Sequence, residues 1–578
     1  MFLNLNAVGF LSLCLTNFVS ARPARNARTN YVLVGAGPAG FVLAEHLTRD
    51  PDVNVVLLEV ATNGDDTADV YVPGNLFNIF DSVWYYLSQP DPTLNGAQPD
   101  SAQGRLVGGG TAVNAMLHCR GSASVFDEWA EISGNEGLSW GNILEAFKET
   151  THWTDALEAD YEQQVNTSSF GNGPVEVTRQ RDEFPFDNPF VDTIATNHNL
   201  QEIDFASGGG IGVTKGLVTI RASNSTRSYA YNTFGYLANT RPNFQLITNA
   251  WASKIDFDGK TATSVTYHDT VTNTTHTLSA DEIIVTAGTI NSAQLLMLSG
   301  VGPADQLEEL GIEVVEDIPG IGSNLMDHHF AVIQYNTTEE QPTRWKYENN
   351  ATWAAEQDAL WNASGDGVLG TDWGDAMGAI RLPDSVFEGT GDFYTKLPAD
   401  RPHIAYIYSN VGTQPEPNAT ALTVWAAMVQ PESRGNVTLA TTDYRDPPLI
   451  YANFWATPGE KALIKAGYQE ARKMFSAPGL QEVIPAETFP GTNVTEANDV
   501  WEAIIETSRS WHHQSGTVSL GSVLDANWRV KGLKGLRVVG AASIPQIPTC
   551  PIQASVYALA KVAASDIATA DGISGTAY

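Results

Sequence analysis

Three glycines and one acid near the N-terminus are spaced in a pattern that could do chemistry. Gly35, Gly37 and Gly40 form a Gly-x-Gly-x-x-Gly motif, and Glu59 follows 19 residues later. Gly35 permits a tight turn, Gly37 lets a phosphate approach the backbone, and Gly40 allows a helix to pack closely on a strand. A carboxylate at Glu59 can accept hydrogen bonds from a ribose. The pattern predicts dinucleotide binding; the alternative is a structural turn without a ligand.

A second group of reactive residue types lies near the other end of the chain, in Trp511-His512-His513-Gln514-Ser515-Gly516-Thr517. A neutral imidazole can accept a hydroxyl proton while a hydride leaves the same carbinol carbon. Successive side chains diverge in extended backbone, so the two histidines should point to different sides. From these residues alone, a buried and hydrogen-bonded structural histidine is the favoured interpretation.

The elements around the glycine motif can be predicted from its flanks. Tyr31 to Val34 is a short apolar run that predicts a buried strand, and Val53 to Leu58 predicts a second. Between them, Phe41 to Arg49 carries apolar residues at helical spacing. Strand, glycine turn, helix and strand make one βαβ unit, whose helix N-terminus offers free N–H groups to phosphates.

Length and charge narrow the class of protein. A chain of 578 residues predicts two or three domains, and 43% hydrophobic residues with 29 prolines fit a globular protein. The 32 basic and 66 acidic residues give a net charge of −34. This charge disfavours nucleic acid and an anionic membrane as partners. No cluster of cysteines and histidines suggests a metal site.

The N-terminal segment and the glycosylation motifs predict secretion. Residues 1–21 resemble a signal peptide, with an apolar run from Ala7 and the small-residue pattern Val19-Ser20-Ala21. No later run is long and apolar enough to span a membrane. The chain has nine Asn-x-Ser/Thr motifs that predict an N-glycosylated extracellular protein. They begin at Asn166, Asn224, Asn273, Asn336, Asn350, Asn362, Asn418, Asn436 and Asn493.

Cysteine content leaves the disulfide question open. Cys14 lies in the leader, so Cys119 and Cys550 remain in the mature chain. The two could form one disulfide, although a chain of this size does not need one.

Further motifs identify a family. Gly104-Arg105-Leu106-Val107-Gly108-Gly109-Gly110-Thr111-Ala112-Val113-Asn114 allows close backbone approach to a flat or phosphorylated ligand. This stretch, extended to Met116, resembles the first signature of the glucose–methanol–choline (GMC) flavoprotein oxidoreductases. Residues 288–302 resemble the second signature, with Ala293 where the family usually has proline, and residues 319–328 are similar to a further family segment. The resemblance runs from about Tyr31 to Ile567.

The resemblance implies an α/β fold and a set of site residues. A Rossmann-like FAD-binding domain is expected from residues 30–150, 226–330 and 505–578. An interleaved α+β substrate domain, an antiparallel sheet plus helices, is expected from 151–225 and 331–504. In this family FAD takes a hydride from a CH–OH donor, and the register of the His-x-x-Gly-Thr motif makes His513 the base. The expected cofactor-binding residues are Gly35, Gly37, Gly40, Glu59, Arg105, Gly109, Gly110, Asn114, Ala252 and Ala541.

The family pattern also implies how FAD is held. Some members attach the flavin through a histidine next to the residue matching Asn114, where this chain has Val113. Non-covalent FAD is therefore expected. The strand from Phe244 to Ile255 and the strand from Asp281 to Ala287 should complete the FAD domain.

One departure from the family pattern affects the residues expected to act on the substrate. The family's second active-site residue, usually His or Asn, falls on Pro551, whose side chain can neither donate a hydrogen bond nor accept a proton. Gly540 and Ala542 also stand where the family has aspartate and serine. The enzyme could use His513 alone, or Cys550 or His512 could act instead, although a buried and inert cysteine is the favoured interpretation of Cys550. The alternative is a non-redox lyase or cyclase that retains FAD; a non-catalytic flavin-binding protein is the weaker third possibility.

The substrate is a small molecule that the sequence does not name. A run of tryptophans at Trp345, Trp353, Trp361 and Trp373 could line a pocket for an aromatic or sugar-like substrate. Ordinary core or lid packing is the favoured alternative for these residues. The sequence does not indicate an oligomeric state.

Overall fold

The computed structural model describes residues 29–62, 68–154, 165–374, 376–413 and 420–574. The expected signal peptide, residues 1–21, and the glycosylation motif at Asn418 lie outside the described residues. Two large sheets, each with its own apolar core, organise the described chain.

The first large sheet is parallel and contains the predicted βαβ unit. Its strand order is β24-β13-β1-β2-β9, and every pairing is parallel. Leu33 lies beside Ile284 on one neighbour and beside Leu57 on the other, and all three side chains are fully buried. Strands buried on both faces require continuous apolar runs, which is why these segments were recognisable. The strands are β24 (Leu536–Val538), β13 (Glu282–Val285), β1 (Thr29–Val34), β2 (Val53–Leu58) and β9 (Phe244–Ile247).

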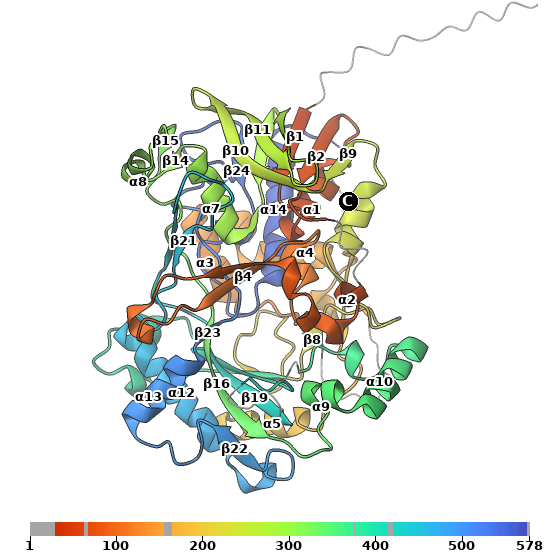
Figure 1. Ribbon diagram of the computed structural model, residues 1–578, viewed down its shortest axis with the longest axis vertical. Coiled ribbons are helices and arrows are strands. Elements are labelled where there is room, and N and C mark those ends of the chain that lie inside the picture. Colours follow the sequence, from red (N-terminus) through yellow and green to blue (C-terminus); the bar gives the residue numbers. More distant parts are fainter. Residues whose placement is uncertain (1–28, 63–67, 155–164, 375, 414–419, 575–578) are drawn as a thin grey trace, which may run out of the picture.

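Three helices form a layer beside this sheet (Figure 1). Helix α1 (Pro38–Leu47) packs on α14 (Gln553–Ala570), and α14 packs on α4 (Trp140–Thr150). Pro38 begins α1 directly after Gly37, where the missing proline N–H costs nothing. No side chain caps the first turn of α1, so its N–H groups remain directed at the end of β1. The α/β fold class expected from the sequence is confirmed.

One strand that the sequence predicts is divided into two strands in the structure. Residues from Phe244 to Ile255 were expected to form a single strand, but β9 ends at Ile247 and β10 spans Ala250–Asp258. Asn249 interrupts the run with a φ of 56°, in the left-handed region that asparagine tolerates. The turn lets β9 complete the parallel sheet while β10 joins an antiparallel sheet with β11 (Thr261–Asp269) and β12 (Thr274–Ser279).

The second large sheet is antiparallel and lies at the opposite end of the molecule (Figure 1). Its order is β22-β16-β19-β18-β17-β7, with β23 (Arg509–Ser510) pairing β16. Helices α5 (Asp187–His198), α12 (Pro458–Phe475) and α13 (Ala497–Thr507) pack against it. The residue boundaries of the two domains stay a prediction. The six strands are β22 (Ala486–Phe489), β16 (His329–Asn336), β19 (Ala421–Met428), β18 (Ile404–Ser409), β17 (Met377–Ile380) and β7 (Gly212–Thr214).

The polar stretch from residue 61 to residue 103 contains an ordered hairpin between the two halves. After α2 (Ala68–Tyr71), strands β3 (Val83–Leu87) and β4 (Asp100–Gly104) pair antiparallel. Both strands contribute side chains to the large cavity described below. Within the described part of the chain, no helix has both the length and the apolar character needed to cross a bilayer.

Candidate active site

A cavity of about 560 Å³ lies between the two large sheets. The β1–α1 turn, the loop at residues 109–117 and the start of α14 line it from the parallel-sheet side. Phe330 of β16, Ile407 of β18 and Trp425 of β19 line it from the antiparallel side. Residues 510–514 also reach the cavity. The glycine motif and the histidine segment, which the sequence singles out for chemistry, therefore meet at one place.

Two glycine loops face each other at one end of the cavity. A Cβ on Gly109 would lie 2.9 Å from Gly37 Cα, closer than two carbons can approach. The Gly108 N–H donates to the Ala36 carbonyl at 2.8 Å, which ties the loops together. Gly35 has a φ of 110°, and a Cβ there would meet the Thr286 carbonyl at 2.6 Å. The backbone can therefore come close to a ligand at this end.

Glu59 is a buried acid held by backbone donors. The Ala36 N–H donates to its Oε2 at 2.9 Å, and the Ala61 N–H donates to its Oε1 at 3.1 Å. Burial raises the pKa of Glu59 to about 7, although these N–H groups favour the charged form. The carboxyl keeps further acceptor capacity toward the cavity, as a ribose site requires.

Most of the predicted cofactor residues lie around this cavity. Gly35, Gly37, Glu59, Gly109, Gly110, Asn114, Ala252 and Ala541 line it. Gly40 and Arg105 are not among the lining residues. A Cβ on Gly40 would lie 2.3 Å from the Gly35 carbonyl, which is the close helix–strand contact expected of the third glycine. The Arg105 guanidinium stacks over Trp84 at 4.5 Å from the ring centre.

Asn114 is fixed by a buried network. Its Nδ2 donates to Gln553 Oε1 at the start of α14. The fully buried Arg227 donates to the Asn114 carbonyl at 2.6 Å and to its Oδ1 at 2.8 Å. Loop and helix are thus locked together in the wall of the cavity.

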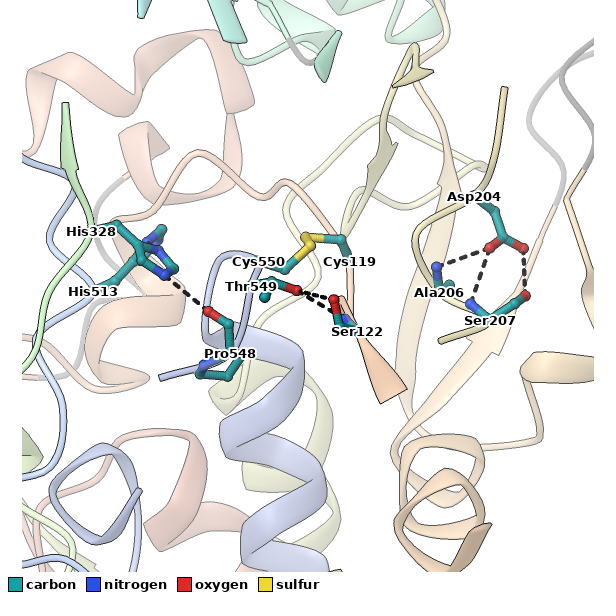
Figure 2. The surroundings of a disulfide bond; sticks show 10 residues. All are labelled: Cys119, Ser122, Asp204, Ala206, Ser207, His328, His513, Pro548, Thr549 and Cys550. Carbon is teal, nitrogen blue, oxygen red and sulfur yellow. Dashed lines mark hydrogen bonds between the residues drawn. A yellow bond between two sulfur atoms is a disulfide. The ribbon is translucent and has the colours of Figure 1, made fainter. Parts of the chain in front are cut away.

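His513 lies in the cavity wall and contacts a second histidine. Its Nδ1 is 2.9 Å from the Nδ1 of His328, and the rings are nearly perpendicular at 89°. The Nε2 of His328 is in turn 2.9 Å from the carbonyl oxygen of Pro548 (Figure 2). His513 is half-buried, whereas His328 is fully buried. Burial, followed by the positive charge that His328 and His512 can carry, holds the pKa of His513 well below its usual range.

Asp327 organises the loop that carries His513. The carboxylate accepts the His513 N–H at 2.8 Å and the Gln514 side-chain amide at 3.1 Å, and Ser510 Oγ also donates to it. Burial raises the pKa of Asp327 to about 7, against the effect of these hydrogen bonds. The backbone of the histidine loop is therefore fixed by the segment that directly precedes β16, on the antiparallel side.

His512 turns its ring toward β4. Its Nδ1 accepts the Ala102 N–H at 3.2 Å, and its Nε2 is 3.8 Å from Asp100. The side chain also lines the cavity and is 43% exposed. The side chains of the two adjacent histidines thus point in different directions. In the described contacts, His513 pairs with His328, whereas His512 pairs with β4.

The hypothesis of a reactive thiol at Cys550 is wrong. Cys550 forms a disulfide with Cys119, across 431 residues of sequence, so it carries no free thiol (Figure 2). Beside it, Thr549 Oγ1 accepts the Ser122 N–H at 2.9 Å. These contacts fix the segment that leads to Pro551, which lines the cavity. The position of the family's second polar residue is therefore rigid and apolar.

The four tryptophans of the run do not line this cavity, and Trp373 shows the core packing that is the favoured alternative. None of Trp345, Trp353, Trp361 and Trp373 is among the lining residues of the described cavity. Trp373 is buried in the core of the antiparallel half, with its indole N–H donated to the Gly74 carbonyl at 2.8 Å. The tryptophans that do line the cavity are Trp84, Trp251, Trp425 and Trp511.

The sequence alone does not single out His328 and Asp327 as site residues. Both belong to the segment 319–328 that resembles the family, so a signal was present. Their contacts with the histidine loop join positions 185 and 186 residues apart, which no local pattern indicates.

The chain belongs to the GMC oxidoreductase family. The family's N-terminal model matches residues 30–330, and its C-terminal model matches residues 431–560. The protein is thus an FAD-dependent oxidoreductase, as expected from the motifs.

Similar proteins cover almost the whole chain. A GMC oxidoreductase family protein of Malassezia sympodialis, Mala s 12, is 30% identical over 573 residues, which are 93% of this chain and 92% of the relative. Patulin synthase of Aspergillus clavatus is 29% identical, over 94% of this chain and 92% of the relative. The solved structure of an FAD-dependent oxidoreductase from Chaetomium thermophilum has a TM-score of 0.84 and 27% identity. The match covers 94% of this chain and 99% of that structure's chain.

The cavity fits the family's cofactor. A Cβ on Gly37 would have its nearest neighbour at 3.9 Å, and a Cβ on Gly110 would meet nothing within 4 Å, so both glycines face open space. The uncapped first turn of α1 supplies N–H groups for a pyrophosphate. Glu59 supplies the acceptor for a ribose.

Proposed function

We propose that the protein oxidises the CH–OH group of a small alcohol to a carbonyl, with His513 as the base. The observation that carries this proposal is the position of His513 in the cavity wall with its Nδ1 engaged by His328. The lowered pKa of His513 supports it, because a neutral imidazole can accept the hydroxyl proton.

In this mechanism the cavity holds the alcohol so that its oxygen faces His513. Bound FAD supplies the hydride acceptor, and oxygen or another acceptor reoxidises it. The residues that would hold FAD are those of the two glycine loops, Glu59 and Asn114. His513 takes the proton as the carbinol hydride leaves, so the alkoxide never has to form free in the cavity. Asp327 keeps the base in place by accepting the His513 N–H.

Non-covalent attachment of FAD is part of the proposal. Val113 lines the cavity next to Asn114, and its side chain cannot bond to a flavin. Flavin released by mild acid precipitation of the protein would support this, whereas flavin that stays with the denatured chain would contradict it.

The aromatic wall of the cavity, formed by Phe330, Trp425 and Trp511, favours a neutral aromatic alcohol as the substrate. Phe330 and Trp425 stack at 4.6 Å between ring centres, and Trp425 meets Trp511 edge-on at 6.4 Å. Trp511 then contacts His513 at 5.0 Å, so the aromatic surface ends at the base. An aromatic ring placed on this wall gains about 0.5–1.5 kcal/mol per ring pair beyond its burial. Among the described lining residues there is no lysine or arginine to pair with an anionic substrate.

We also propose that the protein is secreted and N-glycosylated. Of the eight glycosylation motifs in the described residues, seven have an exposed asparagine, and Asn336 is half-buried. Exposed asparagines are accessible to the modifying enzyme. A drop in apparent mass after enzymatic removal of N-glycans from the secreted protein would support this proposal, and an unchanged mass would contradict it.

The test of the proposed function is anaerobic reduction of the flavin in the purified holoenzyme. Benzyl alcohol, glucose and formate serve as probes of an aromatic alcohol, a sugar and an anion. Benzyl alcohol should bleach the oxidised flavin fastest, with one aldehyde formed per flavin reduced, and formate should not bleach it. No bleaching by any alcohol of a wide panel would contradict the proposal.

A second candidate function is that of a lyase or cyclase that retains FAD. Pro551 favours it, because this position in the cavity wall then carries no polar side chain. That candidate predicts product without peroxide, without reduced acceptor and without flavin reduction.

A further inference from the structure

The hydrogen bonds of the buried His328 determine where its proton lies. A carbonyl oxygen can only accept, so the 2.9 Å contact with Pro548 requires a proton on His328 Nε2. A neutral imidazole carries one N–H, which leaves the Nδ1 of His328 as an acceptor. The 2.9 Å contact between the two Nδ1 atoms then requires the proton on His513. The chain of donors runs from His513 through His328 to Pro548.

This order selects one form of the base. With its proton on Nδ1, His513 has an unprotonated Nε2, which is the only ring nitrogen left to accept a proton from a substrate. The other tautomer would place two N–H groups or two lone pairs at an interface that needs one of each. Which nitrogen of a catalytic histidine is free is commonly decided by the partner of the other nitrogen.

We propose that His328 is a positioning residue that holds His513 as the Nδ1–H tautomer and so provides, from behind the base, the polar support that Pro551 cannot give. The inference rests on the proposed function, because it concerns the same base. His328 does not touch the substrate. It accepts the Nδ1–H of His513, and this hydrogen bond strengthens when His513 gains a second proton at Nε2.

The surroundings of His328 keep it neutral and in one orientation. The titratable groups beside it are its sequence neighbours Asp327 and His329 and its hydrogen-bond partner His513. Asp327 directs its carboxylate to Ser510 and to backbone N–H groups, and His329 stacks on Phe454 at 3.5 Å between ring centres. Burial lowers the pKa of His328 to about 4, while the carbonyls of Pro548 and Val429 act in the opposite direction. His328 is therefore neutral, and an acceptor at Nδ1, above about pH 4.

The test compares three variants of the holoenzyme in anaerobic flavin reduction with benzyl alcohol. His328→Leu and His328→Phe remove both hydrogen bonds and differ in shape. His328→Asn keeps an acceptor, because its Oδ1 can take the place of Nδ1. The apolar variants should lower the limiting reduction rate by about 100-fold or more, with the substrate dissociation constant little changed. His328→Asn should remain within about tenfold of the wild type.

The pH profile separates positioning from a merely structural role. Loss of the acceptor removes stabilisation of the doubly protonated His513, so the acid limb of the rate should move to lower pH in the apolar variants. A purely structural role would lower FAD content and rate without moving this limb. An apolar variant that binds FAD and reduces it within threefold of the wild type overturns the inference.

A measurement on the wild-type holoenzyme needs no variant of His328 to fold. A long-range ¹H–¹⁵N spectrum of protein labelled at its 11 histidines reads each tautomer, and His513→Ala identifies the signal of His513. We expect the proton on Nδ1; a proton on Nε2 at neutral pH would overturn the inference. If wild-type flavin is not reduced by any alcohol, the proposed function fails, whereas normal wild-type reduction with an unaffected His328→Leu variant removes only the present inference.

Discussion

Replacing Gly109 by alanine should force apart the two glycine loops that face the cavity. Gly109 has a φ of 55°, and an added Cβ would lie 2.9 Å from Gly37 Cα. An L-residue in this backbone region costs about 1–2 kcal/mol. A carbon forced into a packed contact adds about 1–3 kcal/mol. The lower entropy of the unfolded chain offsets about 0.4–1 kcal/mol of this, which leaves a loss of about 1–5 kcal/mol.

The assay is urea unfolding of the apoprotein, followed by tryptophan fluorescence, with FAD affinity measured separately. Gly110→Ala is the matched control, because a Cβ there meets nothing within 4 Å of protein. The control should change the free energy of unfolding by no more than about 0.5 kcal/mol. It should still weaken FAD binding, since the new methyl group extends into the cavity.

Two outcomes would refute this reasoning. Gly109→Ala could show the wild-type unfolding midpoint, in which case the close contact of the loops does not exist in solution. Gly110→Ala could bind FAD as tightly as the wild type, in which case the cofactor does not pass over this loop. Equal slopes of free energy against urea are needed for the comparison to report stability.

Further changes test other parts of the account. The raised pKa of Glu59, about 7, means that the folded state binds more protons than the unfolded state between pH 4.5 and 7, so stability falls as pH rises through this window. Glu59→Gln should reduce that decline in the apoprotein by about 3 kcal/mol between pH 5 and 8, measured by urea unfolding; an unchanged decline would place its origin elsewhere. The pKa of His513 lies well below 6.5, so kcat/KM should stay high at pH 6.5 and fall only at lower pH, as His513 becomes protonated; a fall beginning above pH 7 would contradict this. Replacing Cys119 and Cys550 together by alanine should lower the free energy of unfolding by about 2–5 kcal/mol, and an unchanged unfolding midpoint would count against the disulfide.

The cofactor half of the site could be predicted from the sequence because its requirements are local. Gly35, Gly37 and Glu59 lie within one βαβ unit, and the turn, the helix and the strand each have their own residue pattern. The same holds for the loop at Gly109, where a backbone without side chains is the recognisable feature. All four residues line the cavity.

The rest of the site depends on contacts between distant segments. Two contacts follow from how the two halves pack, and no spacing along the chain encodes them. Asp327 accepts the His513 N–H, and Cys119 pairs with Cys550. The sequence leaves both a core and a pocket position open for Trp373, because a tryptophan can occupy either. Its burial and its hydrogen bond to Gly74 show that it packs in the core.

The most direct test of the central claim is single-turnover flavin reduction by benzyl alcohol in the wild type and in His513→Ala. Both proteins should bind FAD, since the His513 side chain has no described contact with the glycine loops or Glu59. His276→Ala, a change of an exposed histidine on β12, is the control. We predict reduction at the wild-type rate in the control and a loss of about 10²–10⁴-fold in His513→Ala. Reduction of His513→Ala at the wild-type rate would contradict the assignment of His513 as the base.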